Sequence, residues 1–246
     1  MKPLIGVSSN FRIDPLEPHR PQLYLDATYH DAVLAAGGTP HLTPVPDEYD
    51  DALLDEILAG FDGLIFTGGF DLHPRHFDQA VHPRTTLLHR RRDRLEVALF
   101  RRADVAELPI LAICLGHQVA HVARGGQLVQ HVDELGLTPA LTHYLPQDAN
   151  AFHRIAIESG SRLAEIVGAT DMEVNSRHHQ IVDQTRPGRG LRPVAFAPDG
   201  VLEASEDCDG RFLLSVQWHP ESLFDRPEHL RLFEALVAEA GRHHRR

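Results

Sequence analysis

The stretch Pro109-Ile-Leu-Ala-Ile-Cys-Leu-Gly-His-Gln118 decides the fold of this chain. Its apolar run stops abruptly at Cys114, and an amphipathic segment follows at once. This pattern predicts a buried strand that turns sharply into a helix, with the cysteine on the turn. A thiol at such an elbow projects clear of the sheet, where the free N–H groups of the following helix favour a thiolate and can bind an oxyanion. The sequence therefore indicates Cys114 as a candidate nucleophile.

Short apolar runs alternate with stretches of helical spacing in the first half of the chain. The apolar runs cover residues 4–8, 63–67 and 110–114, and the helical spacing covers 24–36, 49–58 and 87–105. Such alternation is typical of a parallel sheet wrapped by helices. The segment after Cys114 ends at Gly125-Gly126, which predicts a helix with a glycine stop. We therefore expect a doubly wound α/β fold with a mostly parallel central sheet and an active site at the carboxyl ends of its strands.

The second half of the chain has a different pattern, in which strand-like pieces follow one another closely. These pieces are residues 128–130, 153–157, 193–197, 201–205 and 212–217. Pro198-Asp-Gly200 joins two of them and is a strong turn signal, so we expect a hairpin and more antiparallel pairing here. An amphipathic helix is predicted over 227–239, followed by a frayed basic tail at 241–246. Because no linker or repeat interrupts the pattern, we expect residues 1–246 to form a single domain.

The composition argues against several classes of function. A formal net charge of −11 at pH 7, with the basic residues scattered, argues against a nucleic-acid or acidic-membrane partner. The chain opens on a strand-like segment rather than a charged leader, and no apolar run approaches the length of a membrane span. Two cysteines among 246 residues do not make a disulfide framework. The expected compartment is therefore the reducing cytoplasm.

A candidate base for Cys114 stands near the end of the chain, in Ser215-Val-Gln-Trp-His-Pro-Glu221. His219 and Glu221 are two residues apart, which places them on the same side of an extended backbone. A thiol nucleophile needs a base to take its proton, and the base needs a third group to fix its tautomer. The alternative is a buried cysteine and an unrelated surface histidine. Spacing alone leaves both interpretations open.

A glycine pair follows another predicted strand, in Ile65-Phe-Thr-Gly-Gly-Phe-Asp71. Adjacent glycines permit positive φ and let backbone N–H groups face a ligand, as an oxyanion hole requires. Gly-Gly also marks many ordinary turns. The glycine pair alone therefore does not decide between an oxyanion hole and an ordinary turn, and the other segments are needed.

Considered together, these segments resemble the class I glutamine amidotransferase-like superfamily and, within it, the stand-alone γ-glutamyl-γ-aminobutyrate hydrolase branch. The matching motifs, in chain order, are Thr67-Gly-Gly-Phe-Asp71, Arg92-Asp-Arg-Leu-Glu96, Ile113-Cys-Leu-Gly-His-Gln118 with Gly125-Gly-Gln-Leu128, Val174-Asn-Ser-Arg-His-His-Gln180, and Val216-Gln-Trp-His-Pro-Glu221. The cysteine elbow and the His-Pro-Glu ending are shared by the superfamily. Arg-Asp-x-x-Glu and Val-Asn-Ser-x-His-His-Gln point to the hydrolase branch.

The resemblance implies a flavodoxin-like fold and hydrolysis of a γ-glutamyl amide through a γ-glutamyl thioester, with no metal or organic cofactor. Cys114 would be the nucleophile, His219 the general base and then acid, and Glu221 the carboxylate that orients His219. The implied substrate is γ-glutamyl-γ-aminobutyrate or a related γ-glutamylated amine, which would place the enzyme in polyamine breakdown. A homodimer is compatible with this interpretation.

The resemblance also assigns the groups around the nucleophile. The backbone N–H of Leu115 and one from Gly69 or Phe70 would form the oxyanion hole. The pocket for the γ-glutamyl head group would be lined by Gly68, Gln118, His178 and His179. An alternative for the two histidines is a partly exposed pair that packs a loop.

Two departures from the family pattern bear on the substrate. Ala112 stands where the family elbow usually has glycine, and the turn should survive this change unless it needs positive φ there. The hydrolase branch often has arginine directly after the cysteine, whereas this chain has Leu115 and then His117, as in glutamine-using amidotransferases. One alternative is therefore a glutaminase subunit that passes ammonia to a separate synthase. Another is a non-catalytic binding or regulatory relative.

Two further patterns have simpler interpretations. His117 and His121 are an i, i+4 pair on a predicted helix, but no carboxylate or cysteine completes a metal-ligand set at a suitable spacing. We therefore expect no metal. The basic run from Arg90 to Arg94 is expected to be a solvated helix face, although Arg92-Asp93 and Glu96 could pair within the helix or brace the site.

Overall fold

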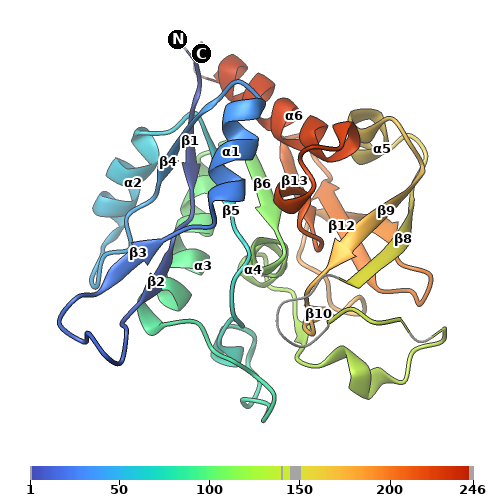
Figure 1. Cartoon of the computed structure of the whole chain (residues 1–246), viewed down its shortest axis with the longest axis horizontal. Helices are drawn as coiled ribbons and strands as arrows, with labels where there is room; N and C mark the ends of the chain where they lie inside the picture. Colours follow the sequence, from blue (N-terminus) through green and yellow to red (C-terminus); the bar gives the residue numbers. More distant parts are fainter. Residues whose placement is uncertain (1, 140, 145–150, 244–246) are drawn as a thin grey trace.

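Strand β6 (Ile110–Ile113) is the apolar run that precedes Cys114, and it lies in the parallel part of a nine-stranded sheet with a parallel neighbour on each side. The structure is a computed structural model that describes residues 2–139, 141–144 and 151–243. The parallel strands lie in the order β4 (Thr39–Leu42), β1 (Leu4–Val7), β5 (Gly63–Phe66), β6 and β13 (Leu213–Val216). In chain order this is 2-1-3-4-5, the flavodoxin-like arrangement. The predicted doubly wound α/β fold is confirmed (Figure 1).

An antiparallel extension completes the sheet beyond β13. Its strands are, in spatial order, β12 (Leu202–Asp207), β11 (Leu191–Phe196), β8 (Ala151–Ile157) and β9 (Asp171–Ser176). The predicted hairpin is therefore confirmed as β11 and β12. Two small sheets pair β2 (Asn10–Arg12) with β3 (Gln22–Tyr24), and β7 (Leu128–Val129) with β10 (Ile181–Val182).

Helices cover both faces of the sheet (Figure 1). One face carries α1 (Ala27–Ala35), α5 (Arg162–Val167) and α6 (Pro227–His243), and α6 contacts both of the others. The other face carries α2 (Asp51–Ala59), α3 (Arg90–Val105) and α4 (Leu115–Ala123). Short 3-10 turns are η1 (Pro74–Phe77), η2 (Val132–Leu135) and η4 (Pro220–Ser222). Within the described residues, no helix is long and apolar enough to cross a membrane.

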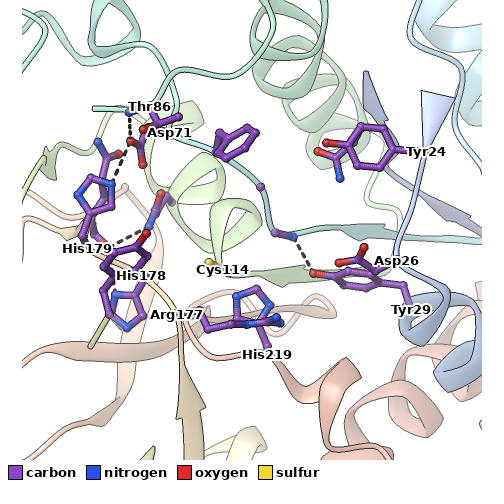
Figure 2. A pocket seen from close by; sticks show the side chains of 17 residues that line it. Tyr24, Asp26, Tyr29, Asp71, Thr86, Cys114, Arg177, His178, His179 and His219 are labelled. Carbon is purple, nitrogen blue, oxygen red and sulfur yellow. Dashed lines mark hydrogen bonds and ion pairs between the residues drawn. The ribbon is translucent and has the colours of Figure 1, made fainter. Parts of the chain in front are cut away.

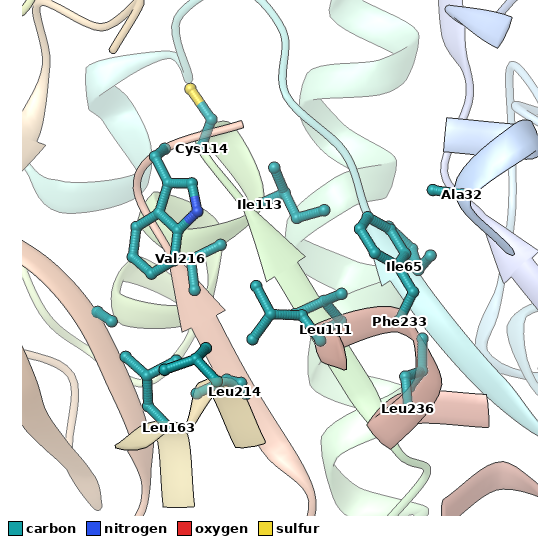
Figure 3. Packing of buried hydrophobic residues seen from close by; sticks show 14 of the residues in the cluster. Ala32, Ile65, Leu111, Ile113, Cys114, Leu163, Leu214, Val216, Phe233 and Leu236 are labelled. Carbon is teal, nitrogen blue, oxygen red and sulfur yellow. The ribbon is translucent and has the colours of Figure 1, made fainter. Parts of the chain in front are cut away.

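Side chains alternate between the two faces of the sheet along each strand, and helices cover both faces. The central strands are therefore buried on both sides. Leu111 and Ile113 point into the core beneath α1 and α6, together with Phe233 of α6 (Figure 3). Ile110 and Ala112 point into the second core, beneath α3 and α4. This two-sided burial explains why β6 is an uninterrupted apolar run in the sequence.

The structure corrects some predicted boundaries. Helix α6 continues through His243, so residues 241–243 are not a frayed tail, and residues 244–246 lie outside the described residues. Arg242 donates to Glu239 one turn earlier, and basic residues in a last turn are favoured by the helix dipole. Ala112 does not have positive φ, which explains why the elbow accepts alanine there.

Gly116 in the first turn of α4 lies directly against the backbone of β5. A Cβ atom at this position would be 2.3 Å from the carbonyl oxygen of Phe66. Neither the helix turn nor the buried strand can move away cheaply, because both are part of a close-packed core. Glycine is therefore required for α4 to start where it does.

Gly116→Ala is expected to lower the free energy of unfolding by about 2–3 kcal/mol, the upper part of the usual range for overpacking. Urea denaturation of the purified variant measures this change. Gly60→Ala is the matched control, because Gly60 has φ −82° and a Cβ there would meet only Ile57 O at 3.5 Å. The control should differ from the parent by no more than about 0.5 kcal/mol. Equal stability of the two variants would contradict this account of the approach of α4 to β5.

Candidate active site

Cys114 occupies a strained elbow between β6 and α4. Its backbone has φ +51° and ψ −102°, and its N–H donates to Val216 O at 2.8 Å. A non-glycine residue at positive φ is uncommon and persists only where the surroundings hold it. The thiol lies at the N-terminus of α4, at the carboxyl end of β6. This is the predicted strand-to-helix turn.

A cavity of about 310 Å³ opens over this edge of the sheet. Cys114 and His219 both line it, which brings together residues from the middle and the end of the chain (Figure 2). Its other walls come from the Gly68–Asp71 segment, the Arg177–Gln180 segment, and Asn10, Tyr24, Asp26, Tyr29, Thr86, Gln118 and Tyr144. The pocket therefore lies where the crevice rule places ligands in an open α/β sheet.

His219 is held by a carboxylate and by a backbone clamp. Its Nδ1 lies 2.7 Å from Oε1 of Glu221. Asn175 of β9 accepts from His219 N at 2.9 Å and donates to His219 O at 3.0 Å. Burial alone would lower the pKa of His219, but the charges of Glu221 and of Cys114 outweigh it and raise this pKa to about 10. The imidazole is therefore favoured in its protonated form at neutral pH.

The turn between His219 and Glu221 differs from the extended backbone that the spacing suggested. Strand β13 ends at Val216, and Pro220–Ser222 form the 3-10 turn η4. The turn brings the carboxylate back to the imidazole. The contact of the two side chains is as expected, but its backbone cause is different.

Gly68 and Gly69 are required because other side chains approach them closely, not because their backbone has positive φ. A Cβ on Gly68 would lie 2.7 Å from Cε1 of His219, and one on Gly69 would lie 2.5 Å from Nη1 of Arg92. Neither glycine is among the positive-φ residues. Gly68 N donates to the Tyr29 hydroxyl at 2.9 Å, so the N–H groups of Gly69 and Phe70 are the better placed candidates for an oxyanion.

Arg92 braces this glycine loop from beneath. Its Nη2 donates to Thr67 Oγ1 at 2.8 Å and to Gly68 O at 3.1 Å, and it pairs with Glu96 Oε1 at 3.1 Å. Arg92 and Glu96 are both 1% exposed. The alternative in which Arg92 and Glu96 pair within the helix and brace the site is therefore the one observed, and the charge is neutralised and hydrogen-bonded inside the protein.

The three side chains predicted to line the pocket are found there, each with a partner. Gln118 donates through Nε2 to Gln180 O at 3.0 Å. His179 Nε2 lies 3.0 Å from Oδ2 of Asp71, while His178 Nδ1 lies 3.2 Å from Gln180 O. Burial lowers the pKa of His178 to about 3. His178 is therefore a buried neutral imidazole rather than an exposed one.

Several residues of the site were not singled out from the sequence, and three of them hold or approach His219 and Glu221 or the glycine loop. Tyr29 comes from α1, and its pKa is raised well above its ordinary value by burial and then by the charge of Glu221. Arg177 lines the pocket and approaches Glu221 Oε1 at 3.4 Å. Asn175 clamps His219. Asn175 and Arg177 belong to the Val174–Gln180 motif, so the signal was present, whereas Tyr29 has none.

His117 and His121 do not face a common ion. His117 Nδ1 lies 2.9 Å from Ser215 Oγ, and His121 Nε2 lies 3.1 Å from Ser205 Oγ. Burial lowers the pKa of His117 well below the ordinary value of 6.5, and lowers that of His121 to about 3. Both rings are therefore neutral parts of the core.

These buried histidines predict a loss of stability in acid. A group whose pKa is depressed by folding takes up a proton on unfolding, so its stabilisation is present above pH 6.5 and is lost as the pH falls toward about 3. For His121 the loss between pH 7 and pH 5 is about 2 kcal/mol. Urea denaturation measures the free energy of unfolding at pH 7 and at pH 5. In His121→Gln the difference between these two values should be smaller than in the parent by about this amount. The exposed His30→Gln serves as control, and an unchanged difference in the His121 variant would disprove the assignment.

The chain is similar to known proteins over most of its length. The peptidase C26 family model matches residues 3–221. A candidate glutamine amidotransferase of Mycobacterium tuberculosis is 40% identical over 224 residues, which cover 90% of this chain and 69% of the relative. The γ-glutamyl-γ-aminobutyrate hydrolase of Escherichia coli K12 is 30% identical over 210 residues, which cover 80% of this chain and 78% of the relative.

Solved structures agree on the fold. The glutaminase domain of Trypanosoma brucei CTPS, solved with bound acivicin, has a TM-score of 0.63 at 19% identity and covers 97% of this chain and 94% of its own. A candidate GMP synthase component of Thermoplasma acidophilum has a TM-score of 0.65 at 14% identity and covers 100% of this chain and 99% of its own. At these identities the likeness establishes the fold alone.

Proposed function

The chain belongs to the peptidase C26 family, which is class I glutamine amidotransferase-like, and from this we propose that it is a cysteine-dependent hydrolase of a γ-glutamyl amide. The observation that carries the proposal is the Cys114 elbow, which faces the same cavity as His219, itself hydrogen-bonded to Glu221. A thiol, a base and an orienting carboxylate are the groups that acyl transfer requires. The reducing cytoplasm is the proposed compartment, because it would keep Cys114 in the thiol form.

The proposed mechanism has two steps. The Cys114 thiolate attacks the γ-carbonyl carbon, and the resulting oxyanion is bound by the N–H of Leu115 and one from Gly69 or Phe70. Protonated His219 gives its proton to the departing amine, which leaves a γ-glutamyl thioester. His219 then takes a proton from water as the water attacks, and the thiolate is released with glutamate or a glutamyl acid as product. The raised pKa of His219 suits its first role as an acid.

The proposed head-group pocket carries charges of both signs. Arg177 offers a guanidinium, and Asp26 and Asp71 offer carboxylates. An amino-acid head group carries one carboxylate and one ammonium, so this pairing supports a γ-glutamyl substrate. The close-fitting wall would come from Gly68, Gln118, His178 and His179. Since Gln118 Nε2 already donates to Gln180 O, its Oε1 is the atom left for the substrate.

The leading proposed substrate is γ-glutamyl-γ-aminobutyrate or a related γ-glutamylated amine, in polyamine breakdown, in keeping with the hydrolase relatives. A second candidate is a glutaminase subunit that passes ammonia to a synthase. It is favoured by the M. tuberculosis relative and by Leu115 and His117 after the nucleophile. A non-catalytic relative is disfavoured by the intact Cys114, His219 and Glu221 set.

Cys114→Ala is expected to reduce hydrolysis of γ-glutamyl amides by at least about 10³-fold, because the covalent step is lost. A panel of γ-glutamyl amides and glutamine is offered to purified protein, and a rapid acid quench followed by mass spectrometry detects the thioester on Cys114. Cys208→Ala is the matched control, since Cys208 is the exposed free cysteine. Undiminished turnover by Cys114→Ala would refute the mechanism. Turnover of glutamine alone, stimulated by a partner, would favour the second candidate.

Glu221→Gln is expected to lower kcat by about 10²–10⁴-fold with little effect on KM, as loss of an orienting carboxylate does in other triads. The Glu221 charge raises the pKa of His219, so its removal should shift the basic limb of the kcat/KM profile to lower pH. A pH–rate series on both proteins measures the shift. Glu239→Gln on α6 should keep the parent profile. A variant profile with an unmoved basic limb would show that Glu221 does not act through His219.

A further inference from the structure

Three imidazoles and one carboxylate converge in the interior behind the pocket wall. They belong to His143, His153, His178 and Glu203, whose side chains are at most 4% exposed. From Oε1 of Glu203, the distances are 3.4 Å to His153 Nε2 and 3.7 Å to both His143 Nδ1 and His178 Nε2. The ligand atoms of His143, His153 and Glu203 all lie within 4.8 Å of one another. Four separate segments of the chain supply these groups.

The second nitrogen of each ring is already used as a donor. His143 Nε2 donates to Asp199 Oδ2 at 2.8 Å, His153 Nδ1 to the carbonyl of Arg154 at 3.2 Å, and His178 Nδ1 to the carbonyl of Gln180 at 3.2 Å. Carbonyl and carboxylate oxygens only accept, so each of these outer nitrogens carries a hydrogen. The nitrogens that face Glu203 are therefore the ones available to a metal ion.

The polar atoms at the centre of the cluster make no hydrogen bonds. Among the residues that the structure describes, the three inward nitrogens and both oxygens of Glu203 have no hydrogen-bond partner. A buried carboxylate without a hydrogen bond is strongly unfavourable unless a positive charge lies beside it. The distances are also longer than hydrogen bonds, which have donor–acceptor distances of about 2.7–3.2 Å.

The distances from Glu203 to the rings of His143 and His153 are close to the edges of a metal coordination shell. With bonds of about 2.0–2.1 Å, neighbouring ligands of a tetrahedral ion are about 3.4 Å apart. We propose that His143, His153 and Glu203 bind one divalent transition-metal ion, with His178 Nε2 beside them at 3.7 Å from Oε1 of Glu203. Two imidazoles with one carboxylate suit zinc rather than the all-oxygen shells of calcium or magnesium. The hydrogen bond from His143 to Asp199 is the outer contact that usually orients a metal-binding imidazole.

Three protein ligands leave the fourth position of a tetrahedral ion for a further ligand. The ion would join β8, β12 and the segment 141–144, and His178 N of the Arg177–Gln180 loop donates to His143 O at 2.9 Å. That loop lines the cavity over Cys114, so the ion would fix one wall of the pocket (Figure 2). This inference does not depend on the reaction proposed above, and it departs from the absence of metal that the resemblance implied.

The test measures metal in full-length protein that carries Cys114→Ala, so that thiolate binding does not contribute. Elemental analysis after extensive dialysis should find about one equivalent of metal per chain. Protein stripped with a chelator and titrated with Co²⁺ should show the intense visible absorption of a four-coordinate ion and a raised Tm. Both readouts are independent of catalysis.

Glu203→Gln keeps the shape of the side chain but removes its charge, so it should weaken Co²⁺ binding by more than about 100-fold. Asp199→Asn is the milder variant and should weaken binding by about 10–100-fold. His82→Gln is the matched control, because it removes a part-exposed imidazole paired with Glu134 and leaves the cluster intact. It should bind the ion as the parent does.

Each outcome either supports or overturns the site. The site is supported if Glu203→Gln loses one equivalent of metal per chain while its circular dichroism spectrum remains that of a folded protein. His82→Gln should then keep the metal content of the parent. Metal that survives Glu203→Gln but falls with His82→Gln would be adventitious binding to surface histidines and would overturn the proposal. Absence of binding in the stripped parent would overturn it as well, in favour of a protonated histidine beside Glu203.

Discussion

The contact between the first turn of α4 and the backbone of Phe66 sets the geometry on which the rest of the site depends. Only a glycine at position 116 allows this approach, and with the helix held there the chain must turn at Cys114 within a single residue. The positive φ at Cys114 is the local cost of that turn, offset by the two cores that hold β6 and α4. The thiol is consequently fixed at the carboxyl end of β6, where Cys114 lines the cavity although it is only 5% exposed.

The antiparallel half of the sheet supplies the residue that holds the catalytic imidazole in place. The thiol comes from the parallel half, but the imidazole beside it is clamped by Asn175 of β9 at the far edge of the sheet. The same segment continues into Arg177, which approaches Glu221. A displacement of β9 would therefore move the base, its carboxylate partner and one wall of the pocket together. This coupling explains why the Val174–Gln180 motif appears as one contiguous stretch in the sequence.

Local patterns are predictable from this sequence, and long-range convergence is not. The β6 strand, the elbow and the hairpin of β11 and β12 follow from periodicity and turn residues, which act over a few positions. Motifs indicate Cys114, His219 and Glu221, although not the 3-10 turn that joins the last two. The sequence leaves open whether Arg92 is solvated or paired with Glu96, and the packing of the Thr67 loop against Arg92 decides for the buried pair. Glu203 carries no signal at all, since its partners are distant in the chain.

His178 shows how closely the chemistry of the pocket and the stability of the interior are linked. Its ring lines the cavity over Cys114, yet its inward nitrogen points to Glu203 and its other nitrogen is fixed by Gln180 O. Gln180 O also accepts from Gln118, so the two pocket residues share one carbonyl as their anchor. A ring that is 3% exposed and anchored by Gln180 O cannot turn toward a substrate without breaking that buried polar contact, which is costly in the interior. His178 therefore acts as a rigid wall, and the shape of the head-group pocket is set by charges that lie behind it.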